Sequence, residues 1–129
     1  SITDGGEWCE LLDNPNVKNR GISGDVAWGV YDRLAFVLEN TPAKIFLLIG
    51  INDVAQGVPA DSIVFCTKLI VNKIKEDSPY TRIYIQSVLP VNDFYGLFTG
   101  HTSRWEIVAE INEGLKLLAE KENVTYIDL

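Results

Sequence analysis

Two polar residues stand in this sequence where acyl-transfer chemistry could use them. Ser1 precedes a glycine-rich turn at residues 5–6, and Asn52 belongs to a Gly-Ile-Asn-Asp tetrapeptide that follows the apolar run 45–49. A serine hydroxyl can attack an ester carbonyl, and an amide at a strand end can donate a hydrogen bond to the oxyanion that forms. The pair therefore indicates a nucleophile and an oxyanion-binding group. The alternatives are an ordinary terminal serine and an asparagine that only satisfies its own turn.

A third candidate is Gly24, which lies in the tetrapeptide Ile-Ser-Gly-Asp just before a predicted helix. A backbone N–H at the entrance of a helix can hold a developing negative charge. The alternative is a glycine that only provides backbone freedom. We expect Asp25 to cap the helix and fix this turn, and Asp53 to order the loop around Asn52 rather than to react.

Alternating strands and helices must position these residues. Apolar runs predict three strands, and a shorter, more polar strand is expected before them: residues 45–49, 83–88 and 124–127, preceded by 17–22. Helical spacing of apolar residues predicts helices at about residues 7–12, 25–40, 61–77 and 103–118. The first of these should bury Trp8 and Leu11 or Leu12. Asp25 is a predicted N-cap, and Ser103 and Glu106 are predicted to form a capping box.

Strand–helix–strand units of this length form right-handed crossovers, so we predict an α/β fold with a parallel sheet and helices on both faces. Ligands of such sheets bind beyond the carboxyl ends of the strands. The loops at residues 50–53 and 89–101 should therefore rim one crevice. The aromatic stretch at residues 92–98 would either wall that crevice, together with Trp8 or Trp105, or pack its rings onto the core.

Composition and charge narrow the classes of partner. The 129 residues carry a net charge of −7 with scattered Lys and Arg, so neither nucleic acid nor an anionic membrane surface is expected. No apolar stretch approaches the roughly 20 residues that span a bilayer, so no membrane insertion is expected.

Cys9, Cys66 and one His offer no metal-ligand spacing, so no metal or cofactor is expected. The two cysteines are predicted to be small buried side chains, with a single disulfide as the alternative. The expected ligand is a small, neutral or polar molecule.

The motifs around these candidates resemble those of SGNH (GDSL-type) hydrolases, a family of esterases and lipases. Ser1, the Asn-x-x-Ile-Ser-Gly-Asp stretch at residues 19–25 and the Gly-x-Asn-Asp stretch at residues 50–53 follow one another in the family's order. The resemblance implies a flavodoxin-like, three-layer α/β/α fold with a parallel sheet. It also implies that Ser1 is the nucleophile, and that the Gly24 backbone N–H and the Asn52 side chain bind the oxyanion.

Three stretches are most similar to acetylhydrolase-type members of this family, including platelet-activating-factor acetylhydrolase and carbohydrate O-acetylesterases: residues 21–25, 47–53 and 86–92. The implied reaction is hydrolysis of a small acyl ester, an acetyl ester in the first place, on a carbohydrate or a lipid. Trp8, Phe94 and His101 are the expected substrate-pocket residues.

Two parts of the family pattern are absent from the sequence. The family's nucleophile lies in Gly-Asp-Ser or Gly-Asn-Ser after a first strand, and its base lies in a late Asp-x-x-His. His101 does not fit the second motif, because Phe98 stands three residues before it. We therefore expect residues 1–129 to form a single, incomplete domain, truncated at both ends, whose histidine and aspartate lie elsewhere.

Two other readings stay open from the sequence. The chain could be a non-catalytic fragment or binding module that keeps the ligand crevice. Alternatively, Ser1 could use its own α-amine as the base, as N-terminal nucleophile hydrolases do. The compartment is not determined: a soluble protein in the cytoplasm, in the periplasm or outside the cell fits equally, and the oligomeric state is open.

Overall fold

The computed structural model describes residues 2–129, and Ser1 lies outside the described residues. At its centre is a parallel sheet of three strands in the order β1-β2-β3, formed by β1 (Lys44–Leu47), β2 (Arg82–Gln86) and β3 (Thr125–Ile127). Ile45 pairs with Ile83, and Ile85 pairs with Tyr126. The three apolar runs therefore form strands where the sequence predicts them, and every strand boundary lies within two residues of the expected one.

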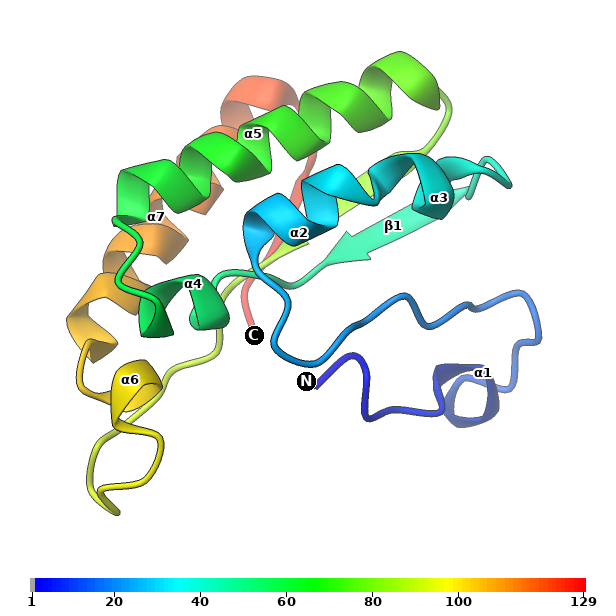
Figure 1. The fold of residues 1–129 in the computed structure, drawn as a ribbon. Coiled ribbons are helices and arrows are strands. Elements are labelled where there is room, and N and C mark those ends of the chain that lie inside the picture. Colours follow the sequence, from blue (N-terminus) through cyan, green and yellow to red (C-terminus); the bar gives the residue numbers. More distant parts are fainter. Residues whose placement is uncertain (1) are drawn as a thin grey trace.

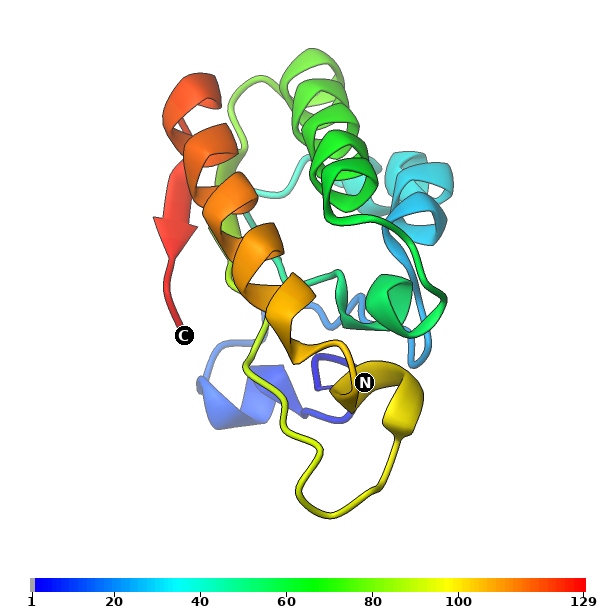
Figure 2. The ribbon, with the colours of Figure 1, turned by 90° about the vertical axis from the view of Figure 1, so that its left-hand side faces the viewer.

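Four helices form one layer over a face of this sheet (Figures 1 and 2). Helix α5 (Ala60–Asp77) connects β1 to β2, and α7 (Trp105–Glu122) connects β2 to β3. These two pack side by side, while α2 (Ala27–Asp32) and α3 (Leu34–Leu38) lie against α5. The predicted α/β fold with a parallel sheet and flanking helices is confirmed.

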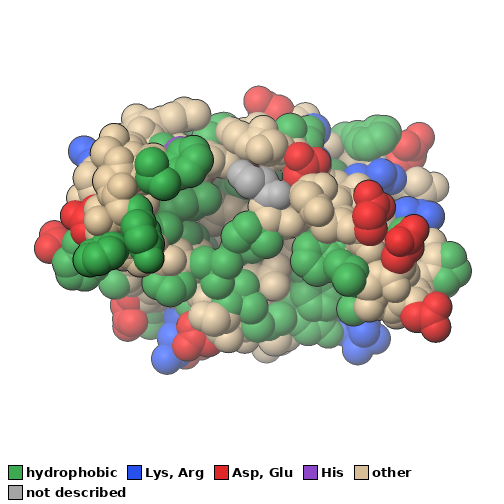
Figure 3. Space-filling view, turned by 90° about the horizontal axis from the view of Figure 1, so that it is seen from below, with side chains coloured by type: hydrophobic (Ala, Val, Ile, Leu, Met, Phe, Trp, Pro, Cys, Tyr) green, Lys and Arg blue, Asp and Glu red, His purple; other side chains and the backbone are tan. Residues whose placement is uncertain are grey.

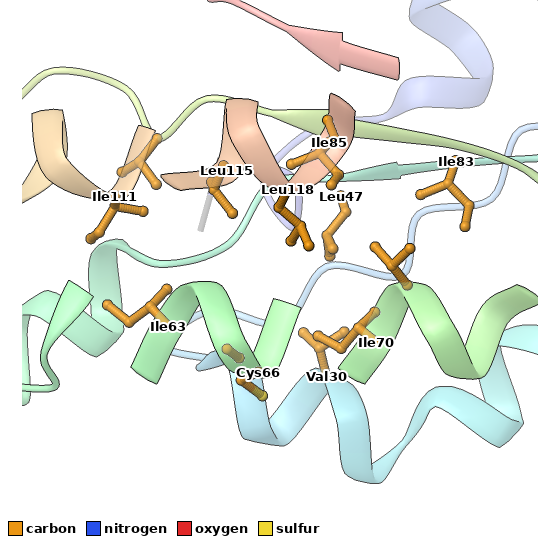
Figure 4. Packing of buried hydrophobic residues seen from close by; sticks show 14 of the residues in the cluster. Val30, Leu47, Ile63, Cys66, Ile70, Ile83, Ile85, Ile111, Leu115 and Leu118 are labelled. Atoms are coloured by element: carbon orange, nitrogen blue, oxygen red, sulfur yellow. The ribbon is translucent and has the colours of Figure 1, made fainter. Parts of the chain in front are cut away.

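The hydrophobic core lies between this helical layer and the sheet (Figure 4). Alternate residues of β1 and β2 point toward the helices, as the period of two in a strand requires. Their partners on α5 and α7 recur at helical spacing. The core residues drawn in Figure 4 include Leu47, Ile83, Ile85, Ile63, Cys66, Ile70, Ile111, Leu115 and Leu118, all of them buried.

The opposite face of the sheet carries aromatic side chains. The rings of Phe46 and Tyr84 stack with centroids 4.6 Å apart, and Phe46 stays 55% exposed. Residues 2–26, with the short helix α1 (Trp8–Leu11), lie on this side of the sheet in Figure 1. Viewed from this side, hydrophobic side chains occupy much of the middle of the surface (Figure 3).

Two further short helices lie toward the carboxyl ends of the strands, α4 (Ile51–Ala55) and α6 (Thr99–Thr102). They fall in the two loops that the sequence places around one crevice, and they pack against each other. The prediction that both loops border the same region is therefore confirmed. None of the helices in the described part of the chain has the length and apolar character needed to cross a membrane.

Several local predictions at helix ends are wrong. The helix expected over residues 25–40 is split at Arg33, which closes α2 and opens α3, and its N-cap is Val26 rather than Asp25. Ser103 cannot begin a capping box, because its backbone is helical (φ −69°, ψ −11°) and its N–H closes α6 by donating to Thr99. Arg104 is the N-cap of α7, without a side-chain hydrogen bond.

The expectations for the first part of the chain also need correction. Residues 17–22 form no strand, and two of their N–H groups instead make local hydrogen bonds: Gly21 donates to the Asn19 side chain, and Val17 donates to the Asn14 carbonyl. The predicted helix at residues 7–12 is present as α1, but Leu11 and Leu12 are exposed and Trp8 is only half-buried.

Candidate active site

Asn52 lies in the first turn of α4, just after β1, at the carboxyl end of the sheet. The chain turns at Gly50 (φ 130°) and starts α4 one residue later. This turn brings the Asn52 side chain back toward the segment before α2, where its Nδ2 donates to the Asp25 carbonyl over 2.8 Å. Two motifs that lie 27 residues apart in the sequence are thus joined directly by a hydrogen bond.

Gly24 occupies the turn beside this contact. Its φ is 81°, and a Cβ added there would have no heavy atom within 4 Å. The position therefore needs glycine for its backbone conformation and not for lack of space. Within residues 2–129 the Gly24 N–H donates to no carbonyl or side chain.

The Asp25 carboxylate holds the same turn in place. Its Oδ1 accepts the Val26 N–H at 3.0 Å, and its Oδ2 accepts two N–H groups of Arg33, at 3.0 and 2.7 Å. The carboxylate fills the space beside Gly29, where an added Cβ would stand 2.0 Å from Oδ1. The expectation that Asp25 fixes this turn is confirmed, although it does so through Arg33 and Val26 rather than as the N-cap.

Asp53 connects the two motifs a second time. Its carboxylate is buried, and both of its oxygens lie 3.1 Å from the Ala27 N–H at the first turn of α2. Burial raises the pKa of Asp53, and the hydrogen bond from Ala27 opposes that rise. Asp53 orders the loop, as predicted, by satisfying a helix N–H that α2 itself cannot satisfy.

Ser1, the predicted nucleophile, lies outside the described residues. The turn that follows it is held by Asn19, whose Nδ2 donates to the carbonyls of Thr3, Asp4 and Gly6 at 2.7, 3.1 and 3.0 Å. The role of Asn19 was not predicted. Its position at the head of the Asn-x-x-Ile-Ser-Gly-Asp stretch, with the Asx-type contact to Gly21, is the signal that could have indicated it.

The three expected pocket residues are placed very differently. His101, on α6, lies beside Asn52, with its Nε2 at 3.2 Å from the Asn52 Oδ1. Phe94 is 83% exposed at the loop tip and packs edge-on against Tyr95. Trp8 donates its indole N–H to the Thr3 carbonyl, within the segment of α1. The structure therefore brings only His101 next to a predicted oxyanion donor, and the pocket roles of Phe94 and Trp8 stay predictions.

The aromatic loop does not pack its rings onto the core. Phe94, Tyr95 and Phe98 are all largely exposed, which removes that alternative. Trp105 instead lines a shallow hollow of about 270 Å³ at the carboxyl end of β2, together with Val88, Val91, Asn112 and Leu129. Gly24, Asn52 and His101 do not line this hollow.

The cysteines are both free thiols, so the structure has no disulfide between them. Cys66 is buried, as predicted, and burial raises its pKa to about 11. Cys9 is exposed, contrary to the prediction that both are buried, because α1 buries none of its residues. Among residues 2–129, no group of three His, Cys, Asp or Glu side chains is arranged to bind a metal ion.

The parallel sheet with its flanking helices matches the fold of SGNH-type hydrolases. The sequence profile of the GDSL-like lipase/acylhydrolase family matches residues 1–129, and the chain belongs to this family. Among curated proteins, none matches the chain.

Solved structures show the same fold. A structure from Streptococcus pneumonia, solved under the name of a platelet activating factor, is 28% identical with a TM-score of 0.87, and the match covers 99% of this chain and 62% of that one. A GDSL-like lipase from Bacteroides thetaiotaomicron is 18% identical with a TM-score of 0.79, and the match covers 98% of this chain and 61% of that one. A variant of an acetylxylan esterase from Geobacillus stearothermophilus is 21% identical with a TM-score of 0.68, and the match covers 85% of this chain and 52% of that one. The chain thus spans about 62% or less of the length of each of these three proteins.

Proposed function

We propose that this chain supplies the nucleophile and the oxyanion-binding groups of a serine esterase. The observation that carries the proposal is the hydrogen bond from Asn52 Nδ2 to the Asp25 carbonyl, which holds the asparagine amide next to the Gly24 turn. An oxyanion needs donors that are fixed before charge develops on it. The Asn52 amide retains a second N–H for such a ligand, and the Gly24 N–H has no acceptor among residues 2–129.

In this proposal Ser1 attacks the ester carbonyl, and the carbonyl oxygen becomes an oxyanion bound by Gly24 and Asn52. The leaving alcohol departs, and water then hydrolyses the acyl-enzyme. A histidine outside residues 1–129 would move the protons, and an aspartate would orient this histidine and stabilise its charged form. The substrate is proposed to be a small acyl ester, with acetyl esters of carbohydrate or lipid preferred. The acetylxylan esterase among the structural neighbours supports the acetyl part of this proposal.

The proposal is tested by the hydrolysis of p-nitrophenyl acetate by the full-length protein and its Asn52→Ala variant. Removing one oxyanion donor should lower kcat about 100- to 1,000-fold, equivalent to about 2.7–4 kcal/mol, with little change in KM. Asn72→Ala is the matched control, because Asn72 is an exposed asparagine on α5, outside the site. A kcat that Asn52→Ala leaves unchanged would contradict the proposal.

Acyl preference is tested with the same assay. Acetyl, butyryl and octanoyl esters of p-nitrophenol differ only in chain length, so the ratio of their kcat/KM values reports the size of the acyl site. We expect the acetyl ester to be preferred. A clear preference for octanoyl would retain the esterase mechanism but would replace the small-acyl assignment.

A further inference from the structure

His101 contacts the Asn52 amide from the side opposite to Asp25. Its Nε2 lies 3.2 Å from Asn52 Oδ1, and the His101 side chain is half-buried. The two residues are 49 positions apart in the chain and meet because α4 and α6 pack together. The contact therefore depends on the tertiary structure and not on any local motif.

The chemistry of the two groups fixes the direction of this hydrogen bond. Asn52 Nδ2 already donates to the Asp25 carbonyl, so its Oδ1 faces His101. An amide oxygen only accepts hydrogen bonds, so the imidazole must carry its proton on Nε2 and donate it. Both ends of the Asn52 amide are then held, and flipping the amide would place its oxygen against the Asp25 carbonyl.

The backbone that carries His101 is itself unusual. Phe98, the N-cap of α6, adopts a left-handed conformation with φ 52° and ψ 47°. An aromatic residue rarely takes this conformation, which is less favourable than the right-handed one by about 1–2 kcal/mol. From this position its ring meets the His101 imidazole nearly edge-on, with centroids 6.2 Å apart and an interplanar angle of 83°. The ring thus limits the orientations that the imidazole can take.

We propose that His101 is a positioning residue that donates Nε2–H to Asn52 Oδ1 and thereby fixes and polarises the amide that binds the oxyanion. This inference rests on the proposed function. A hydrogen bond accepted by an amide oxygen makes the N–H groups of the same amide stronger donors, because linked hydrogen bonds polarise one another. The same geometry argues against His101 as the general base, since its Nε2 proton is committed to Asn52.

The test is a double-mutant cycle in the full-length protein with p-nitrophenyl acetate. His101→Phe keeps an aromatic ring but removes the donor, and it should lower kcat about three- to tenfold with KM unchanged. In the Asn52→Ala background the same substitution should have no further effect, because its target is gone. His101→Gln, whose amide nitrogen can replace Nε2 as a donor, should restore most of kcat. Thr99→Ala, an exposed change on α6, should leave kcat at the wild-type value.

The outcomes separate the two proposals. If His101→Phe lowers kcat equally with and without Asn52, His101 acts independently of the amide, and the positioning role is overturned while the esterase proposal stands. If Asn52→Ala alone leaves kcat unchanged, the esterase proposal fails, and the role of His101 fails with it. Asn52 side-chain amide resonances in ¹⁵N NMR spectra give a readout besides activity. They should shift in His101→Phe and return in His101→Gln, and unchanged resonances would overturn the hydrogen bond itself.

Discussion

Replacing Gly29 by alanine tests how the Asp25 carboxylate holds the Gly24 turn. In an ordinary helix this change stabilises the protein by about 1 kcal/mol, because alanine has the higher helix propensity. In α2 the new Cβ would stand 2.0 Å from Asp25 Oδ1, so the carboxylate must move. That movement disrupts its hydrogen bonds with Val26 and Arg33.

The expected net effect follows from these two opposing quantities. Hydrogen bonds to a charged group contribute about 1.5–3 kcal/mol. We use about 2 kcal/mol, because the Arg33 and Asp25 side chains are 24% and 13% exposed. Subtracting the propensity gain of about 1 kcal/mol leaves a destabilisation of about 1 kcal/mol for Gly29→Ala. The Gly24 turn should loosen as well, so under the proposed function kcat should fall with stability.

The decisive comparison uses the Asp25→Ala background, in which the space beside residue 29 is free. There Gly29→Ala should stabilise the protein by about 1 kcal/mol, so the sign of its effect reverses. The coupling of about 2 kcal/mol between the two sites is well above the roughly 0.3–0.5 kcal/mol within which independent mutations add. Urea unfolding followed by circular dichroism measures all four free energies. A stabilising Gly29→Ala in the wild-type background would refute the reasoning.

Two further predictions concern buried ionisable groups. Burial raises the pKa of Asp53 in the folded protein above its unfolded value of about 3.9. The contribution of Asp53 to the free energy of unfolding is therefore fully present below about pH 4, and it is lost as the pH rises through the folded pKa. Asp53→Asn should therefore become progressively more stable relative to wild type as the pH rises from 4 to 8 in urea unfolding; a difference independent of pH would contradict this. Cys66 should resist a thiol reagent in the native protein at pH 8, because burial raises its pKa to about 11, while the exposed Cys9 reacts at once. Cys9→Ala should abolish the fast phase and Cys66→Ala should keep it, whereas two equally fast thiols would contradict the structure.

The α/β class, the three strands and the long helices could be predicted from the sequence. Residues 45–49 form a continuous apolar run of strand length, and α5 repeats apolar residues at the period of a helix. These patterns are local and record which side of each element is buried. The meeting of the loops at residues 50–53 and 89–101 also followed, because loops at the carboxyl ends of parallel strands lie together. The contact of Asn52 with the segment beside Gly24 did not follow from this rule, because residues 2–23 include no strand.

Helix boundaries were predicted less well, because a polar side chain near a helix end has several partners to choose from. Asp25 was expected to cap α2, but its carboxylate binds Arg33 and Val26 instead. Ser103 was expected to open α7, but it closes α6. Each sequence signal is compatible with both uses, and the packing of neighbouring elements decides between them.

Only the tertiary structure shows which polar groups hold the candidate site. Asp53 accepts the N–H of Ala27 from 26 residues away, and His101 reaches Asn52 across 49 residues. Periodicity in the sequence predicts whether a residue faces inward or outward. It does not predict which distant donor or acceptor that residue will contact. Those pairings arise when packing of the apolar core brings the loops together and leaves each buried polar group in need of a partner.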